Sequence, residues 1–517
     1  MQRLPRFSSL PVIHVHDLER EGVSAVKERE LFAGYDIGTT SSKISITDNE
    51  GRIVASAKVN HSQSFSDDGY PEQDARVWWQ DFLKLTAMAG KEIPLSSIKA
   101  IGLSSMCPNV LPVSGDGTPL RKSFMYGIDQ RAAKEIELLN EFMRQAGDNP
   151  LYTEYSSQSI LPKILWLRKN EPQIFERTAR VLTANGYIAF RLTGQFASDI
   201  FSLSAGNLID LNTLEIFEDP FDHADLPTEI IPDIKWATDL TGKVTRRASE
   251  ETGLVCGTPV FTGTGDACSD AITNACLEPG NVSISLGGTS IYIQCLDRPV
   301  RSPALFVETG AVPGSFTAGG ATSCGGLLTD WVTDRLFGLD MDEKESLLSG
   351  FRAEEYEPSN MSLLPFFGGA RTPFNNPKAR GILFGLSMET GRKEILSSVF
   401  EAIALDISMI GDEIKRTALE PNQICVSGGG ARSEVLLQLI ATVLDHELLV
   451  SPRQYDSATG AALIALSATS GKALEKVVEE IKKKYDRVEP RAEYSSYMKE
   501  RKNIFKELYT ANIGLFR

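Results

Sequence analysis

The sequence lacks the cysteine and histidine patterns that hold zinc in proteins. Its 7 cysteines include no C-x-x-C and its 5 histidines include no H-E-x-x-H. Most of the cysteines lie in apolar segments, which is typical of buried free thiols in a reducing compartment. We therefore expect neither a zinc site nor a disulfide framework, and we expect a cytoplasmic protein.

Long apolar runs and an excess of basic residues are also missing. No apolar run is long enough to cross a bilayer. The 53 Lys and Arg residues are outnumbered by 68 Asp and Glu, so the formal net charge is −15. Since this charge repels phosphate backbones and anionic lipids, we expect no nucleic acid and no membrane as partner. Residues 1–30 contain no long apolar segment and are interpreted as an N-terminal extension.

The length of 517 residues exceeds what one hydrophobic core organises, and it favours two large domains. Residues 240–256 are polar and show no strong core pattern. We therefore expect one domain over residues 31–250 and a second over residues 251–517.

Strand patterns begin at residue 31. The stretch "LFAGYDIGTTSSKISITDNEGRIVASAKV" predicts three strands, the second and third joined by a tight turn at residues 48–51. Near the C-terminus, "QICVSGGG" and "ELLVSP" are strand-like and each is followed by a helical pattern. This alternation predicts an α/β architecture. A strand ending in a Gly/Thr/Ser turn occurs in each half, "YDIGTTSSK" and "SLGGTSIY", which suggests an internal duplication.

Three Gly-rich turns are candidate phosphate or nucleotide sites: the two just quoted and "VSGGGARS". Backbone N–H groups in such turns can converge on an anion, and hydroxyls add donors. The sequence contains no G-x-x-x-x-G-K-[ST] and no G-x-G-x-x-G after a strand, which excludes a P-loop and disfavours a dinucleotide fold. Taken singly, each turn is better explained as a plain tight turn, but three such turns at strand ends weaken that explanation considerably.

Asp36 and Asp266 each follow an apolar strand and adjoin a Gly-rich turn. A carboxylate beside a phosphate is unfavourable unless a cation or a proton offsets the repulsion. One of the two can therefore hold Mg²⁺, and the other can accept the proton of an attacking hydroxyl. At its reference pKa of about 3.9, Asp266 would already be ionised at neutral pH. The structural alternative for each is a helix cap or a turn aspartate.

Several longer motifs carry a family resemblance. They are "GYPEQDARVWW", "GTGD" at residues 263–266, "LPFFGGARTPFNNPKARG", "SGGGARS" and, above all, "GILFGLSMETGRKEILSSVFE" at residues 381–401. From about residue 31 to 510 the chain resembles the FGGY carbohydrate kinases, in particular their xylulose-kinase-like branch. The resemblance implies an α/β fold of two actin/hexokinase-like (ribonuclease H-like) domains that close around ATP and a sugar in an interdomain cleft.

The resemblance also implies roles for individual residues. Asp266 would be the catalytic base and contact the substrate, and Asp36 would serve Mg²⁺. ATP would be bound by Thr39, Thr40, Lys43, Gly287, Gly288, Thr289, Gly326, Gly428, Gly429, Gly430 and Ala431. The sugar would be bound by Ser105, Met106, Cys107 and Asp129.

The chain departs from the family pattern in the presumed sugar pocket. The loop "GLSSMCPNV" places Pro108 near the position of the family's histidine. The family's Trp-Asn-Asp is Gly-Ile-Asp, at residues 127–129, and the residue after the catalytic aspartate is Ala267. These changes leave ATP chemistry better supported than any named sugar. The resemblance implies ATP-dependent phosphorylation of a small sugar or polyol, with a ketopentose such as xylulose favoured.

Two other functions stay open at this point. An actin-like ATPase would need no sugar pocket, and the signature at residues 381–401 counts against it. A non-catalytic sugar- or nucleotide-binding regulator is compatible with the departures in the pocket. A homodimer is equally open.

Overall fold

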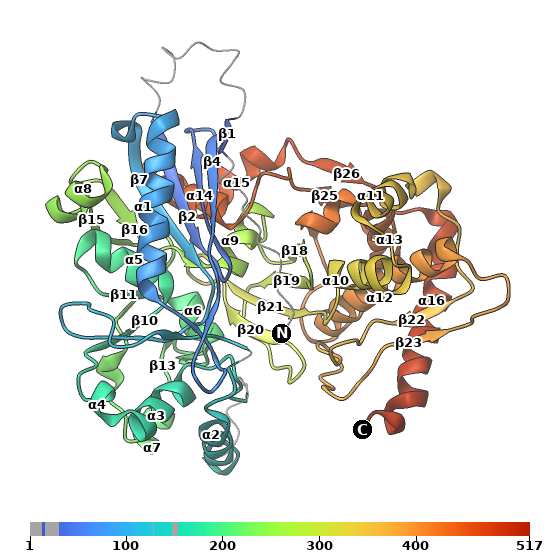
Figure 1. Ribbon diagram of the computed structural model, residues 1–517, viewed down its shortest axis with the longest axis horizontal. Helices are drawn as coiled ribbons and strands as arrows, with labels where there is room; N and C mark the ends of the chain where they lie inside the picture. The colour runs from blue at the N-terminus through green and yellow to red at the C-terminus, as the bar shows by residue number, and fades with distance from the viewer. Residues whose placement is uncertain (1–12, 16–29, 128, 147–153) are drawn as a thin grey trace. The chain divides into compact units, whose positions relative to one another are not determined.

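The computed structural model describes residues 13–15, 30–127, 129–146 and 154–517 (Figure 1). The predicted extension, residues 1–30, therefore lies outside the described residues except for its residues 13–15 and 30. Contacts divide the chain into two compact units. The first contains residues 1–149, 154–269 and 457–481, and the second contains residues 150–153, 270–456 and 482–517.

This division differs from the predicted one near residue 250. The polar stretch at residues 240–256 is not a linker, because it forms strand β15 (Leu240–Lys243) and helix α8 (Arg246–Thr252) of the first unit. In addition, helix α14 (Ser457–Ser470) returns to the first unit and packs against its central strands. The sequence pattern reports the helix but not the sheet on which it packs.

The sheet of the first unit is mixed. Its order is β1 (Ile13–Val15), β4 (Ile53–Asn60), β3 (Ser41–Thr47), β2 (Leu31–Ile37), β7 (Ile98–Ser105), β16 (Pro259–Phe261) and β15, and the short β17 (Thr264–Gly265) also pairs with β7. Strands β4, β3 and β2 are antiparallel, while β7 runs parallel to β2 and to β16. The three strands predicted from residue 31 are confirmed.

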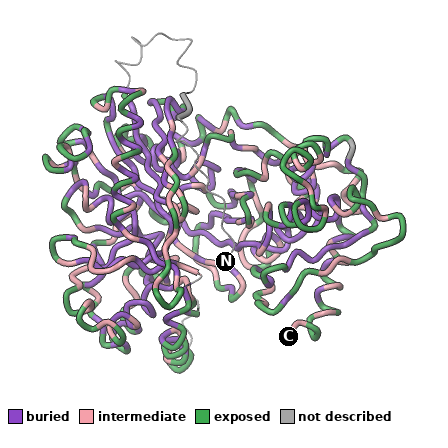
Figure 2. The backbone as a smooth tube through the Cα atoms, in the orientation of Figure 1, coloured by how far each residue is buried: buried purple, intermediate pink, exposed green. Residues whose placement is uncertain are grey.

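Strand β2 is buried along its whole length (Figure 2), because a helix packs on each face of the sheet. On one face Tyr35 stacks on Phe82 of helix α1 (Ala75–Glu92), with ring centroids 4.1 Å apart. On the other face Gly34 lies against the backbone of α14. Alternate residues of a strand point to opposite faces, so both helices can pack on the same strand.

The sheet of the second unit repeats this pattern. Its order is β20 (Phe306–Thr309), β21 (Phe316–Ala321), β19 (Ser290–Leu296), β18 (Asn281–Leu286), β24 (Gln423–Ser427), β25 (Leu448–Val450) and β26 (Asp486–Val488). Strands β21, β19 and β18 are antiparallel, and β24 runs parallel to β18 and to β25. Strands β18 and β24 thus correspond to β2 and β7, which supports the internal duplication.

The correspondence places the predicted turns at equivalent points. The turn at residues 38–40 follows β2, and the turn at residues 287–289 follows its counterpart β18. Helix α12 (Arg392–Thr417) packs against β19 and β21 of the second sheet. Within the described part of the chain, no helix is long and apolar enough to cross a membrane.

Candidate functional site

The ends of three neighbouring strands align Asp36 with polar partners. In the register of the sheet, Asp36 of β2 lies opposite Lys43 of β3 and Ser104 of β7. The buried carboxylate of Asp36 accepts a hydrogen bond of 2.9 Å from the Ser104 hydroxyl. Ser104 in turn lies opposite Thr264 of β17, two residues before Asp266.

Two glycines allow β17 to lie against β7 and bring Asp266 there. Gly263 has a φ of +72°, and a Cβ at this position would lie 1.7 Å from the carbonyl oxygen of Leu103. A Cβ at Gly265 would lie 2.1 Å from Sγ of Cys107. The backbone of β7 leaves no room for a side chain at Gly263, and at Gly265 the Cys107 side chain would have to move, so close packing explains the glycines before Asp266. Asp266 itself begins helix α9 (Asp266–Thr273).

The environment of Asp266 changes its acidity. Burial raises the pKa of this carboxyl to about 7, and the negative charge of Asp36 acts in the same direction. A hydrogen bond of 2.8 Å from the Ala267 N–H and the charge of Lys43 oppose the rise. The expectation of an unshifted carboxylate is therefore wrong. A base whose pKa lies near neutral pH is well matched to accept a proton from an alcohol.

The same pair of carboxylates fits a magnesium ion. After burial, the negative charge of Asp36 is the next contribution to the raised pKa of Asp266, and a divalent cation would offset that charge. The described residues contain no group of three or more His, Cys, Asp or Glu side chains that could hold a metal alone. Magnesium in phosphoryl-transfer sites uses one or two carboxylates together with substrate phosphates, so this sparse set is compatible with it.

The turn after β2 lies beside these carboxylates. Gly38 N–H donates to the Ser41 carbonyl at 3.0 Å, which closes a tight turn. Thr39 is half-buried in this turn and Thr40 is exposed, while Lys43 is half-buried on β3. These are the three residues of the first unit that the resemblance assigns to phosphate.

Tyr126 lies in the same region and was not singled out from the sequence. Its hydroxyl lies 3.3 Å from Oγ1 of Thr39. Burial raises the pKa of Tyr126, and the charges of Asp266 and Asp36 contribute to the increase. The only sequence signal is that Tyr126 directly precedes the departure at Gly127.

The predicted sugar-loop residues differ in exposure. Ser105 and Met106 are fully buried, and the Ser105 hydroxyl donates to Oδ1 of Asn185 at 3.2 Å. Cys107 is half-buried and approaches Gly265. Of the three, only Cys107 has surface available to a ligand in this structure.

Asp129 belongs to a buried charged cluster. Its Oδ1 accepts hydrogen bonds from the backbone N–H and from Nε of Arg131, at 3.1 and 2.9 Å. Arg131 also donates to Oε1 of Glu72 at 2.8 Å. The other oxygen of Asp129, Oδ2, is buried and has no hydrogen-bond partner among the described residues. Asp129 therefore anchors its loop through one oxygen, and its side chain is as buried as those of Ser105 and Met106.

Lys163 lies beside that cluster. Burial lowers the pKa of Lys163 to about 7, and the charge of Asp129 acts against this decrease. Its ammonium group donates to the carbonyls of Ser157 and Ser159, at 2.5 and 3.0 Å.

In the second unit the remaining Gly-rich stretches come together. Strands β18 and β24 are adjacent, with Ser285 opposite Ser427, so the turns that follow them are neighbours. Gly326 N–H donates to the Gly287 carbonyl at 2.9 Å. A Cβ at Gly430 would lie 2.8 Å from Cβ of Leu286, at the end of β18. The predicted nucleotide residues of this unit thus form one cluster: Gly287, Gly288, Thr289, Gly326, Gly428, Gly429, Gly430 and Ala431.

One local detail differs from the prediction. The glycine run does not lead directly into an α-helix. A 3₁₀ helix, η7 (Gly429–Arg432), comes first, and α13 (Glu434–Leu444) begins after Ser433, whose side chain caps it.

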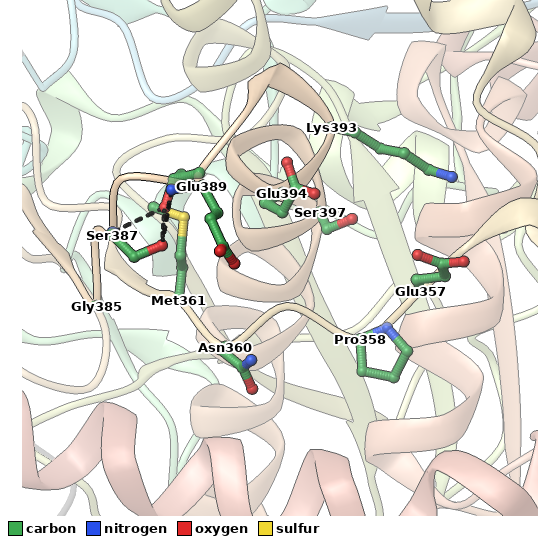
Figure 3. Close-up of a pocket in the computed structure, with 11 residues that line it drawn as sticks. Glu357, Pro358, Asn360, Met361, Gly385, Ser387, Glu389, Lys393, Glu394 and Ser397 are labelled. Carbon is green, nitrogen blue, oxygen red and sulfur yellow. Dashed lines mark hydrogen bonds between the residues drawn. The ribbon is translucent and has the colours of Figure 1, made fainter.

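A cavity of about 280 Å³ lies elsewhere in the second unit (Figure 3). Its lining comes from residues 357–361 and 385–397 and includes Glu357, Glu389 and Lys393. It overlaps the signature segment at residues 381–401 but contains none of the predicted site residues.

Comparisons with known proteins show which family the chain matches. Residues 31–273 match the N-terminal domain of the FGGY family of carbohydrate kinases, and residues 282–469 match its C-terminal domain. The chain is 24% identical over 486 residues to a xylulose kinase of Escherichia coli (strain K12), covering 93% of this chain and 98% of that protein. It is 26% identical over 476 residues to a glycerol kinase of Malacoplasma penetrans (strain HF-2), covering 88% and 92%.

Solved structures show the same fold. A xyloylose kinase from Brucella ovis matches with a TM-score of 0.86 at 24% identity, over 94% of this chain and all of that one (100%). A Plasmodium falciparum glycerol kinase with ADP matches with a TM-score of 0.81 at 21% identity, over 93% and 97%. With both domain matches spanning most of the sequence, the chain belongs to the FGGY family of carbohydrate kinases, and it is therefore a phosphotransferase with the two-domain, mixed α/β fold of that family.

Proposed function

We propose that this kinase transfers the γ-phosphoryl group of ATP to a hydroxyl of a small sugar or polyol, with a ketopentose such as xylulose as the favoured acceptor. The observation that carries the proposal is the position of Asp266. It starts a helix at the end of β17, beside Asp36 and Lys43, and its pKa is raised to about 7. Some relatives are named xylulose kinase and another is named glycerol kinase, which supports a small polyhydroxylated acceptor.

In this mechanism Asp266 accepts the proton of the attacking hydroxyl. Deprotonation makes the oxygen more nucleophilic as it approaches the γ-phosphorus. Lys43 lies near enough to influence the acidity of Asp266, and its positive charge would stabilise negative charge on the transferred group. Backbone N–H groups and hydroxyls of the turn at residues 38–40 would hold the terminal phosphates.

Magnesium would be held by Asp36 together with the phosphates. When bound, the ion supplies positive charge that offsets the phosphate oxygens. Asp36 keeps its orientation through the hydrogen bond from Ser104. The Gly-rich cluster of the second unit would bind the rest of the nucleotide, because its exposed glycines let the backbone approach a ligand closely.

Acceptor recognition would involve Asp129 and Cys107. One buried oxygen of Asp129 has no partner in the described part of the chain, and a substrate hydroxyl that donates to it would satisfy that oxygen. A site built this way rejects analogues that lack the hydroxyl.

Coupled measurement of ADP release tests the proposal. The purified protein is assayed with Mg²⁺ and ATP against a panel of ketoses, aldonates and polyols, each compared with a sample without acceptor. Stimulation by a ketopentose supports the proposal, and stimulation by another acceptor alone corrects the substrate. Equal ADP release with and without every acceptor would contradict the kinase activity.

A further inference from the structure

The carbonyl groups of the turn between β2 and β3 form hydrogen bonds with residues outside the turn. The carbonyl oxygen of Thr39 lies 3.1 Å from Nε2 of His61 and accepts a bond of 2.5 Å from the Gln73 side-chain amide. The backbone N–H of His61 donates to the carbonyl of Thr40 at 2.9 Å. Two successive carbonyls of the turn therefore face His61 and Gln73.

Peptide geometry converts this into a direction for the turn's donors. In a planar trans peptide the C=O and the following N–H point in opposite directions. The Thr39 carbonyl faces His61, so the Thr40 N–H points the other way. The same holds for the Thr40 carbonyl and the Ser41 N–H. Fixing two carbonyls thus aims two N–H donors away from His61.

A second layer fixes His61 itself. Nδ1 of His61 lies 2.7 Å from Oδ2 of Asp81 on helix α1, and the His61 side chain is only 6% exposed. The Ser42 hydroxyl donates to the same Asp81 oxygen at 3.1 Å, and Lys84 lies 3.4 Å from the other one. On the other side of the ring, Nε2 of His61 lies 3.1 Å from the Thr39 carbonyl oxygen and 3.0 Å from the Gln73 side-chain nitrogen, which itself donates to that carbonyl.

The orientation of the Gln73 side chain is also fixed by a hydrogen bond. Its side-chain oxygen accepts a bond of 2.7 Å from the indole N–H of the fully buried Trp78. This bond fixes the amide so that its NH₂ faces Thr39. Gln73 ends strand β6 (Pro71–Gln73) and Trp78 lies one turn into α1, so the motif "GYPEQDARVWW" supplies this half of the chain of bonds.

We infer that His61, held by Asp81, is a positioning residue of the kinase: together with Gln73 it holds the Thr39 carbonyl and aims the backbone donors of the turn toward the ATP phosphates. The inference rests on the proposed function insofar as the bound anion is ATP. The local geometry does not depend on which acceptor is phosphorylated.

Two substitutions of His61 distinguish the contact made by Nδ1 from the contact made by Nε2. His61→Gln places an amide N–H near the position of Nε2, so it retains a donor for Thr39. His61→Asn places its amide near Nδ1, so it retains the contact with Asp81 and loses the one with Thr39. Thr86→Val serves as control, because it removes a buried bond of 2.8 Å to the Tyr35 hydroxyl from the same helix without touching the turn.

We expect His61→Asn to raise the KM for ATP about tenfold, the effect of losing one hydrogen bond, with the KM for the acceptor unchanged. His61→Gln should return the KM for ATP toward the wild-type value, and Thr86→Val should leave it unchanged. Simple loss of folded protein lowers the apparent kcat and leaves the KM for ATP as it was. A wild-type KM in His61→Asn would overturn the inference.

Hydrogen exchange decides the inference independently of activity. In the protein without ligand, the backbone amides of residues 37–43 should exchange faster in His61→Asn than in wild type, His61→Gln or Thr86→Val. Unchanged exchange in His61→Asn overturns the inference. Absence of acceptor-stimulated ADP release in the wild type would instead contradict the proposed function, and the exchange measurement would still decide the role of His61.

Discussion

At the scale of single residues, the proposed chemistry depends on the carboxylate of Asp266. Asp266→Asn keeps the shape of the side chain and removes the base. Its kcat should fall by about 10²- to 10⁴-fold, the range of general-base assistance. The variant should still bind Mg²⁺–ATP, which equilibrium titration with a fluorescent nucleotide measures. An Asp266→Asn protein that folds normally and retains most of its kcat would show that the carboxylate is structural.

The raised pKa of Asp266 also predicts the pH dependence of turnover. A base must be ionised to act, so kcat/KM for the acceptor should fall as the pH decreases through about 7. With Mg²⁺–ATP bound, the cation would offset the charge of Asp36, while burial, the largest cause of the raised pKa, would remain. Asp266→Asn should lack this acid limb. A wild-type profile that stays flat down to pH 5 would contradict the assignment.

The same pKa shift has a consequence for stability. The folded protein holds a proton on Asp266 at pH values where the unfolded chain, near 3.8, has lost it. The contribution of Asp266 to stability is therefore present at low pH and is lost as the pH rises from about 4 to 7. The difference in Tm between Asp266→Asn and wild type, measured by thermal unfolding, should therefore be more favourable to the variant at pH 8 than at pH 5.

Tyr126 can be tested by removing one oxygen. Tyr126→Phe loses the contact of 3.3 Å between its hydroxyl and Thr39. Because Thr39 is a proposed phosphate residue, we expect kcat/KM for ATP to fall about tenfold, the effect of one hydrogen bond. Tyr494→Phe, which loses a bond of 3.3 Å to the Tyr356 carbonyl in the second unit, is the matched control. Equal kinetics for both variants would remove Tyr126 from the site.

At the scale of elements, the first unit depends on how closely α14 approaches β2 and β7. A Cβ at Gly102 of β7 would lie 1.9 Å from the Ala461 carbonyl oxygen of α14. Helix and strand backbones would have to separate to accommodate it.

Gly102→Ala should therefore destabilise the first unit by about 1–3 kcal/mol, as overpacking of a core does. Urea unfolding followed by circular dichroism measures the loss. Gly514→Ala is the control, because nothing lies within 4 Å of a Cβ at that position. If both variants unfold at the same urea concentration, the close approach of α14 is not needed for stability.

At the scale of the whole molecule, binding of the proposed nucleotide should stabilise the fold by mass action. At a concentration one hundred times its Kd, a ligand that binds only the folded state adds about 2.7 kcal/mol. Saturating Mg²⁺–ATP should therefore raise the Tm in differential scanning fluorimetry. A similar rise with Mg²⁺ and sulfate alone would indicate a general anion effect and contradict a nucleotide site.

The sequence by itself determined the local structure, because the relevant signals are local. Strands β2, β3 and β4 and the turn at Asp48 follow from alternating apolar residues and turn chemistry within about thirty residues. The break at Glu171 between α3 (Leu161–Asn170) and α4 (Pro172–Phe175) follows from the proline. The family motifs likewise identified the FGGY kinases, and the matched domains confirm that identification.

The tertiary structure decided what depends on residues distant in the chain. No pattern around residue 460 reveals that α14 packs on strands that begin at residue 31. The acidity of Asp266 is set by burial and by Asp36, 230 positions away in the sequence, so no local motif contains it. The contact of His61 with Thr39 likewise depends on the packing of strands and not on a local motif. Sequence patterns record which residues are near one another along the chain, whereas pKa values and hydrogen bonds depend on which residues are near one another in space.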